Sequence, residues 1–175
     1  MPNRPSWFEL IKDVPNYPKP GIVFKDITPL LANASGFRAV VEDFAAVIAP
    51  LKPTQIIGIE ARGFIFGAAL ARELDVGFTL VRKPGKLPRE TRSVSYDLEY
   101  GSDSLEIHVD ALTATDRAVI VDDVLATGGT AAAVVELVRS TGAEIGALSF
   151  LMELGFLNGR AKLPADVRVE SLITL

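Results

Sequence analysis

The chain has 175 residues, of which 49% are hydrophobic and 23% charged, and its formal net charge is −4. These values exclude intrinsic disorder and argue against a broadly basic surface for nucleic acid. The sequence holds no cysteine and one histidine, His108, which excludes disulfides, thiol nucleophiles and multi-histidine metal sites. No apolar run approaches the roughly 18 residues of a membrane span, and the start of the chain lacks the apolar core of a signal peptide. We expect one cytoplasmic domain over 1–175, without membrane or nucleic-acid partners.

The first quarter of the chain predicts two helices separated by a non-helical segment. Ser6 and Glu9 fit a capping box around a short helix. Turn-forming residues then impose an extended or turning path: Pro15, Pro18, Pro20 and Gly21. Apolar residues recur at helical spacing over Phe37–Ile48, with Ser35 as the expected N-cap.

From residue 55 onward, short apolar strands alternate with helices. The expected strands are Gln55–Ile59, Gly77–Val81, Arg117–Val121, Ile145–Met152 and Val167–Thr174. The expected helices are Phe64–Leu74 and Thr130–Ser140. This alternation predicts an α/β fold whose parallel sheet is covered by helices on both faces. Such sheets bind ligands beyond the carboxyl ends of their strands, at a topological switch point, so we expect the site there.

The stretch from 82 to 110 interrupts this alternation. It opens with the polar, basic run RKPGKLPRETRS. Alternating apolar residues then predict two strands around Leu98–Tyr100 and Leu105–Val109, joined by a turn at Gly101–Asp103. A long polar insertion in a compact α/β domain is often an active-site lid, although a surface hairpin without a role fits the same pattern.

The run AVIVDDVLATGGTAAAVVELV, Ala118 to Val138, contains most of the chemical information. An apolar strand leads to Asp122 and Asp123, a Thr-Gly-Gly turn follows, and a helix begins at once. The helix N-terminus suits a phosphate, and the glycines let the backbone approach it closely. Two carboxylates would repel a phosphate but can accept hydrogen bonds from ribose hydroxyls. The pattern therefore indicates a sugar-phosphate site, and a solvated aspartate pair beside an ordinary turn is the alternative.

Within this run, VIVDDVLATGGT resembles the signature of the type I phosphoribosyltransferases, which bind 5-phosphoribosyl 1-pyrophosphate (PRPP). Further segments resemble the branch of that family that uses adenine: PGIVFKDITPLL, GIEARGFIFGAALA, RKPGKLP and LEYGSDSLEIHVDAL. The resemblance implies one phosphoribosyltransferase domain with a central, mostly parallel sheet flanked by helices. An N-terminal hood over 1–34 and a flexible β-hairpin lid over 82–110 are implied with it.

The implied reaction joins adenine to PRPP and gives AMP and pyrophosphate, as in purine salvage. Mg²⁺ is implied with PRPP, and because it binds largely through substrate oxygens and water, no protein metal cage is expected. The family also implies a homodimer. Where a hypoxanthine-guanine enzyme has an aspartate, this chain has Ala126, which favours adenine.

The resemblance assigns binding roles to three groups of residues. The phosphate and ribose of PRPP or AMP are expected on Asp122, Asp123, Ala126, Thr127, Gly128, Gly129 and Thr130. Pyrophosphate is expected on Glu60, Ala61, Arg62, Arg82, Lys83 and Lys86. Adenine is expected on Val23, Phe24, Lys25 and Leu125.

Two residues are expected to be catalytic. Glu99 would exchange a proton with the purine as N9 attacks C1′, and Arg62 would stabilise charge on the leaving pyrophosphate. For Glu99 the alternative is an exposed hairpin glutamate without a catalytic role. For Phe24, which is expected to bind adenine, the alternative is an ordinary core position.

Two other functions fit parts of the sequence. A regulator that senses PRPP would share the fold, but this chain has neither room for a DNA-binding domain nor the charge of an RNA surface. A phosphoribosyltransferase for xanthine, a pyrimidine or orotate would share the signature, but Ala126 and the segment LEYG argue against it.

Overall fold

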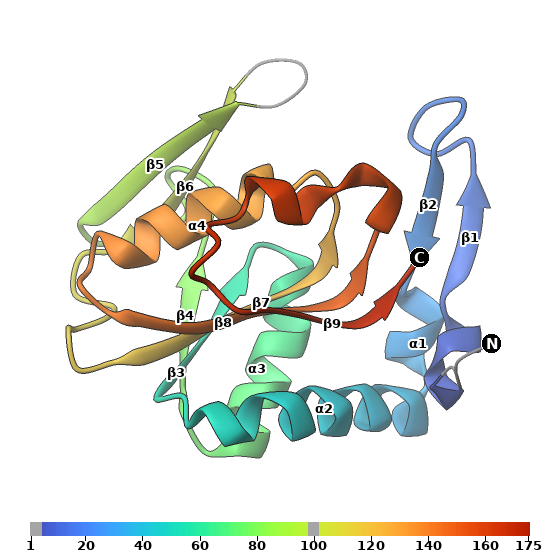
Figure 1. Ribbon diagram of the computed structural model, residues 1–175, viewed down its shortest axis with the longest axis horizontal. Helices are drawn as coiled ribbons and strands as arrows, with labels where there is room; N and C mark the ends of the chain where they lie inside the picture. The colour runs from blue at the N-terminus through green and yellow to red at the C-terminus, as the bar shows by residue number, and fades with distance from the viewer. Residues whose placement is uncertain (1–4, 98–101) are drawn as a thin grey trace. The chain divides into compact units, whose positions relative to one another are not determined.

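The computed structural model describes residues 5–97 and 102–175 of the chain. It divides into two compact units, Met1–Asp43 and Phe44–Leu175, and the division falls within helix α2 (Ala34–Ile48). Figure 1 shows the helices and strands described below. Among the described residues, the Tyr17–Pro18 and Glu60–Ala61 peptide bonds are cis. None of the described helices combines the length and the apolar character needed to cross a membrane.

The first unit contains a short hairpin between helical turns. Strand β1 (Lys12–Pro15) pairs antiparallel with β2 (Val23–Asp26), so the proline-rich segment folds back on itself. The 3-10 helix η1 (Ser6–Leu10) precedes the hairpin and α1 (Thr28–Ala32) follows it. The buried Trp7 donates a hydrogen bond from Nε1 to Asp43 Oδ2 at 2.7 Å, which joins η1 to α2.

Both helix caps predicted in this unit are wrong. Helix η1 has no side-chain cap, and Ser6 is its first residue rather than its N-cap. Ser35 lies inside α2, and Asn33 takes the capping role because its Oδ1 accepts a hydrogen bond from Gly36 N at 2.8 Å. Asn and Ser are about equally favoured at N-caps, so the local sequence alone does not choose between neighbouring candidates.

The second unit is built on a parallel five-stranded sheet with the order β4-β3-β7-β8-β9. Its strands are β3 (Gln55–Ile59), β4 (Gly77–Val81), β7 (Arg117–Leu125), β8 (Glu144–Glu153) and β9 (Val169–Thr174). The predicted α/β fold and its five strands are confirmed. Strand β7 is longer than expected, because Asp122 and Val124 continue the pairing with β8. The two aspartates therefore lie within the strand and not after it.

Helices α3 (Arg62–Leu74) and α4 (Gly129–Arg139) lie on opposite faces of this sheet (Figure 1). Ile120 of β7 and Val134 of α4 are fully buried in one apolar cluster. Gly63 packs α3 closely against β7, since a Cβ there would lie 2.7 Å from Val121 O. Three 3-10 turns occupy connections: η2 (Ala49–Leu51), η3 (Gly155–Leu157) and η4 (Gly159–Lys162). Helices α3 and α4 follow β3 and β7, so both begin at the carboxyl end of the sheet.

A hairpin is present between residues 82 and 110 as predicted, but the predicted turn is wrong at Ser102 and Asp103. Strand β5 (Thr91–Asp97) pairs antiparallel with β6 (Ser102–His108). The chain expected in the turn at Ser102 and Asp103 instead begins β6, and the predicted strand residues Leu98 to Tyr100 lie outside the described residues. Leu105 and Ile107 are buried in the core beside α4, so the base of the hairpin is an integral part of the unit.

Candidate active site

A cavity lies at the carboxyl ends of β3 and β7, where the sequence predicts a ligand site. From β3 the chain passes to β4 on one side and then to β7 on the other, so this is the topological switch point of the sheet. One pocket of about 210 Å³ is lined by Arg62, Phe150 and the segment 122–131. A second, of about 320 Å³, is lined partly by Glu60, Lys83 and Tyr96. The two pockets share Arg62, Asp122, Asp123 and Thr130 as lining residues.

The floor of the first pocket is the loop between β7 and α4, residues 126–130, which we call the phosphate loop. Gly128 has a φ of +82° and is the N-cap of α4. That conformation is easy for glycine and strained for other residues. The amides of the first helical turn have no partner within the helix and carry partial positive charge. The predicted arrangement of strand, glycine turn and helix is therefore present. The residues of the first turn of α4, whose amides can donate hydrogen bonds, line the first pocket.

Asp122 and Asp123 lie side by side at the wall between the pockets. Asp123 is only 4% exposed, and its backbone N donates to Asp122 Oδ1 at 2.9 Å. Burial, followed by the charge of Asp123, raises the pKa of Asp122 well above its ordinary value. Burial also raises the pKa of Asp123, and the nearby Arg62 partly opposes this. Hydroxyl donors from a ligand would relieve the cost of keeping these carboxylates charged.

Arg62 is the first residue of α3 and reaches this aspartate pair. Its Nε lies 2.7 Å from Asp123 Oδ2, and its side chain is 43% exposed. The sequence predicts Arg62 at pyrophosphate and Asp123 at ribose, but the structure brings the two side chains together. Arg62 therefore lies beside the aspartate pair and lines both pockets.

Glu60 organises the basic segment that follows β4. Its carboxylate accepts hydrogen bonds from Arg82 Nε at 3.2 Å, Arg82 Nη2 at 3.1 Å and Lys83 N at 3.0 Å. These donors, Arg82 first, lower the pKa of Glu60. Arg82 also donates from Nη1 to Lys86 O at 3.0 Å. The Arg82 guanidinium is thus held by protein acceptors, and Glu60 shapes the pocket without presenting a bare charge to an anion.

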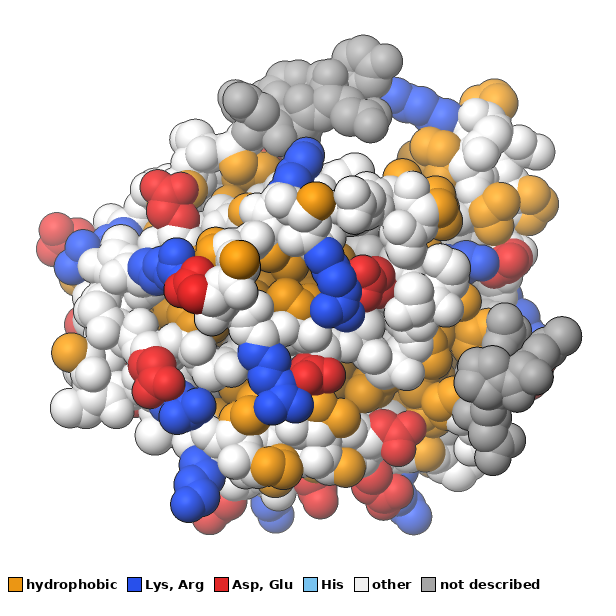
Figure 2. Space-filling model, in the orientation of Figure 1, with side chains coloured by type: hydrophobic (Ala, Val, Ile, Leu, Met, Phe, Trp, Pro, Cys, Tyr) orange, Lys and Arg blue, Asp and Glu red, His pale blue; other side chains and the backbone are white. Residues whose placement is uncertain are grey.

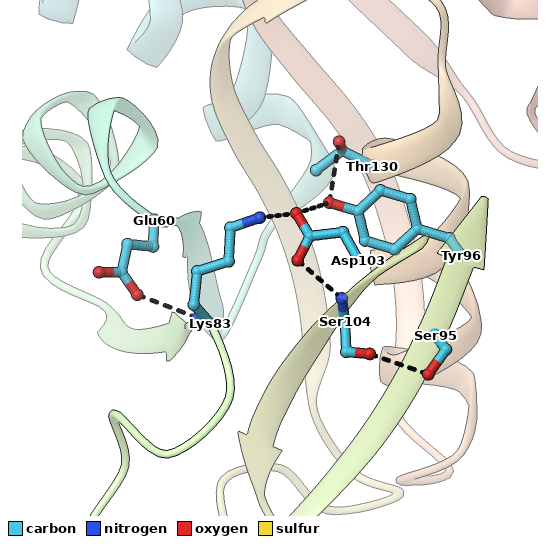
Figure 3. A network of polar contacts seen from close by, with 7 residues as sticks. All are labelled: Glu60, Lys83, Ser95, Tyr96, Asp103, Ser104 and Thr130. Atoms are coloured by element: carbon cyan, nitrogen blue, oxygen red, sulfur yellow. Dashed lines mark hydrogen bonds and ion pairs between the residues drawn. The ribbon is translucent and has the colours of Figure 1, made fainter. Parts of the chain in front are cut away.

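A polar network joins the hairpin to both halves of the site (Figure 3). Lys83 Nζ pairs with Asp103 of β6, and Tyr96 of β5 donates to the same carboxylate at 3.2 Å. Thr130 in turn donates from Oγ1 to the Tyr96 hydroxyl at 3.4 Å. Lys83 and Thr130, both predicted ligands of substrate oxygens, are therefore joined through hairpin residues.

The sequence does not predict Tyr96 and Asp103 as site residues. The available signal is the alternation in TRSVSYD, where Val94 and Tyr96 pack against the core. It is weak because the run contains only two such residues, and β-strand periodicity is hard to read in a short polar run.

The other predicted site residues divide between the two units and the undescribed segment. Glu99 lies outside the described residues. On β2, Val23 is 48% exposed, Phe24 is half-buried with its ring against Tyr17, and Lys25 pairs with Asp13 at 2.6 Å. Leu125 belongs to the second unit, where it is fully buried and lines the first pocket.

Several charges elsewhere on the described surface are paired locally. On the face shown in Figure 2, Lys and Arg side chains lie beside Asp and Glu side chains. Ion pairs such as Arg139–Asp166 at 2.6 Å and Arg117–Glu144 at 3.2 Å have this arrangement. At the cavity, the site's own cations and the helix N-termini supply positive potential for an anionic ligand.

Comparison with known proteins gives one consistent answer. Residues 31–162 match the phosphoribosyl transferase domain family. The chain is 60% identical over 163 residues to the adenine phosphoribosyltransferase of Carboxydothermus hydrogenoformans, covering 93% of this chain and 95% of that one. The solved adenine phosphoribosyltransferase of Thermoanaerobacter pseudethanolicus is 52% identical, with a TM-score of 0.92 and coverage of 95% and 96%. That of Saccharomyces cerevisiae, solved with D-2,5-dideoxy-2,5-imino-altritol 1,6-bisphosphate and adenine, is 42% identical, with a TM-score of 0.89 and 94% of each chain covered.

Proposed function

The chain belongs to the adenine phosphoribosyltransferases, so it transfers the 5-phosphoribosyl group of PRPP to adenine in purine salvage, and we propose how its residues divide this work. AMP and pyrophosphate are the products. The observation that carries the proposal is the convergence of Arg62, the aspartate pair and the phosphate loop on one cavity at the switch point of the sheet. No other part of the described chain combines these chemical groups in one place.

PRPP binds along the cavity with its parts on different elements. The 5-phosphate accepts hydrogen bonds from the amides of the phosphate loop and from the Thr127 and Thr130 hydroxyls. The ribose hydroxyls donate to Asp122 and Asp123. Pyrophosphate lies in the second pocket, near the Glu60–Ala61 backbone, Arg62 and Lys83, with the Arg82 and Lys86 cations adding longer-range attraction.

Transfer breaks the bond between C1′ and the pyrophosphate oxygen, whose electron pair leaves with pyrophosphate, while adenine N9 bonds to C1′. Arg62 stabilises the charge that develops on the leaving group. Glu99 accepts the proton that the purine loses. We propose that adenine contacts Val23, Phe24, Lys25 and Leu125. The yeast relative was solved with adenine, which supports a purine site in related proteins such as this one.

Mg²⁺ accompanies PRPP in this proposal. Among residues 5–97 and 102–175, no three His, Asp or Glu side chains gather closely enough to make a protein metal site. This donor set fits Mg²⁺, which keeps several waters and binds through one or two carboxylates plus substrate phosphates. The carboxylates that line the cavity are Asp122, Asp123 and Glu60, and Glu60 already accepts hydrogen bonds from Arg82 and the Lys83 amide. When bound, the ion supplies positive charge to the phosphate oxygens of PRPP.

We propose that the enzyme is a cytoplasmic homodimer. Strand β4 is an edge of the sheet, and its Leu80 is 38% exposed, as is Ile65 of α3 at 39%. Burial of these side chains against a second subunit would favour association, because apolar surface would leave water. A chain without cysteine also has no need of an oxidising compartment. Light scattering of the purified chain should give the mass of a dimer, and a concentration-independent monomer would contradict that part of the proposal.

The decisive assay follows AMP and pyrophosphate formation from adenine, PRPP and Mg²⁺. Hypoxanthine, guanine, xanthine and orotate serve as competing bases. We expect adenine alone to react at a substantial rate. Failure of the folded, Mg²⁺-supplied protein to form AMP would overturn the proposal, and a preferred alternative base would overturn its specificity.

A further inference from the structure

The segment that follows β8 covers the phosphate loop. Within Gly155–Lys162, Gly159 alone is buried. Its carbonyl oxygen occupies the space beside Gly128, where an added Cβ would lie only 2.2 Å from it. Conversely, a Cβ on Gly159 would lie 2.1 Å from Ala126 O and 3.1 Å from Gly128 N. The two backbones are thus in contact without side chains between them.

The two glycines are required for different reasons. Gly128 has both a positive φ and a close neighbour, so replacing it would disturb the loop in two ways at once. Gly159 is not among the residues with positive φ, so its own backbone tolerates alanine. The three heavy atoms nearest to an added Cβ there all belong to Ala126 and Gly128 of the phosphate loop. Gly159 is therefore the position at which the contact can be tested by itself.

Strong polar contacts hold Gly159 in place. The neighbouring Arg160 donates from Nε to both carboxylate oxygens of Glu153 at 2.8 Å, and its Nη2 lies 2.7 Å from Glu153 Oε2. Arg160 Nη1 also donates to Val169 O at 2.9 Å. Ser171 donates to Glu153 at 3.1 Å, which completes the partners of this buried carboxylate. The segment is thereby fixed to the ends of β8 and β9.

We propose that Gly159 is a positioning residue for the 5-phosphate. Its backbone, anchored through Arg160 and Glu153, holds Ala126–Gly128 in the conformation that directs the loop amides at the phosphate of PRPP and AMP. The inference rests on the proposed placement of the 5-phosphate on this loop. It predicts that the effect falls mainly on ligands that carry that phosphate, because Ala126, Thr127 and Gly128 line the first pocket and not the second.

The test compares Gly159→Ala with Gly155→Ala by calorimetric titration of AMP and, separately, of inorganic pyrophosphate with Mg²⁺. Gly155 belongs to the preceding turn, and a Cβ there would meet only Thr174 Cγ2 at 3.1 Å and Leu175 O at 3.4 Å. We expect Gly159→Ala to weaken AMP binding and raise KM for PRPP at least tenfold, with pyrophosphate affinity and KM for adenine within twofold of wild type. Gly155→Ala should match wild type throughout.

A folded Gly159→Ala protein that binds AMP normally would overturn the inference, as would equal losses for AMP and pyrophosphate. If that variant does not fold, Arg160→Lys retains the charge beside Glu153 but not the forked contacts, and it should show the same ligand selectivity with a smaller loss. Normal AMP binding by Arg160→Lys would then overturn the anchoring role. Thr127→Val with Thr130→Val tests the underlying site: unchanged AMP affinity there would remove the 5-phosphate assignment itself, independently of Gly159.

Discussion

Arg62 Nε and Asp123 Oδ2 lie 2.7 Å apart, and this contact joins the proposed pyrophosphate and ribose subsites. Asp123 is almost fully buried, whereas Arg62 is substantially exposed at the first turn of α3. The arginine therefore offsets a buried negative charge and also lines both pockets of the cavity. A ligand that spans both subsites meets one preorganised unit, which reduces the reorganisation needed when PRPP binds.

Arg62→Met should lower kcat by about 10²- to 10³-fold, the usual effect of removing one donor that stabilises developing charge. It should also raise KM for PRPP, because Asp123 loses its partner. Arg62→Lys should recover part of the affinity but little of kcat, since an ammonium cannot reproduce the planar fork. Steady-state kinetics with PRPP varied at saturating adenine would measure both. Wild-type kcat in Arg62→Met would exclude a catalytic role.

Asp122→Asn should stabilise the protein at neutral pH while it weakens PRPP binding. The folded-state pKa of Asp122 is raised, mainly by burial, so the favourable contribution of its protonated form is present below the ordinary pKa and is lost as pH rises through the raised one. Above the ordinary pKa the wild-type protein therefore carries the cost of either burying the charge or protonating the carboxyl group, and asparagine removes that cost. We expect a gain on the order of 1 kcal/mol, about 2–4 °C in Tm, that disappears below the ordinary pKa.

The matched control is Asp166→Asn. Asp166 is exposed and its pKa is lowered by Arg139, so asparagine there should give no stabilisation at neutral pH. PRPP affinity should fall about tenfold or more in Asp122→Asn, since a charge-assisted hydrogen bond is lost, and stay unchanged in the control. In the wild type, PRPP affinity should fall as pH decreases through the raised pKa. A destabilised Asp122→Asn protein would show that the carboxylate is structurally required.

These predictions depend on geometry that the sequence supplies only in part. Buried apolar runs specified the parallel strands, and the glycine turn specified the phosphate loop, because both patterns are local. The Arg62–Asp123 contact depends on how β3 and β7 pair, and the Asp103–Lys83 contact depends on the register of the hairpin. Neither can be read from spacing along the chain. The Gly159 contact is equally non-local, since one unremarkable glycine meets a loop some thirty residues earlier.

Asp103→Asn should strengthen pyrophosphate binding. Asp103 pairs with Lys83. Burial acts to lower the pKa of Lys83, but the hydrogen bond to Asp103 and the nearby negative charge raise it overall. The same hydrogen bond lowers the pKa of Asp103. Removing the carboxylate charge leaves Lys83 available to an anion, and we expect a several-fold gain in affinity that shrinks at high salt. Asp110→Asn removes the exposed carboxylate that pairs with Arg89 and serves as control. Weaker pyrophosphate binding in Asp103→Asn would indicate that Asp103 orients Lys83 instead of competing for it.

Glu99→Leu tests the proposed proton transfer from the purine to Glu99. This residue comes between β5 and β6 in the sequence, outside the described residues. Loss of a general base typically costs about 10²- to 10⁴-fold in rate. We expect that loss in kcat, with PRPP affinity by calorimetry within twofold of wild type. Tyr96→Phe provides a comparison on the same hairpin, because it removes the hydroxyl between Asp103 and Thr130 but no titrating base. Equal rates for Glu99→Leu and wild type would assign the proton to another acceptor.

Arg160→Met should destabilise the protein in a pH-dependent way. Glu153 is buried, and its pKa is lowered first by the hydrogen bond from Arg160. A lowered folded-state pKa means that the contact contributes stability above the ordinary value of 4.5, and that this stability is lost as pH falls through the lowered pKa. At neutral pH we expect a loss of about 1–3 kcal/mol, since a buried carboxylate loses its charged donor. Denaturant unfolding at neutral and acidic pH measures the difference, which should narrow in acid because both proteins then hold Glu153 protonated. Adding Glu153→Gln to Arg160→Met should recover part of the loss at neutral pH by removing the unpaired charge, and a double variant less stable than Arg160→Met would contradict this account.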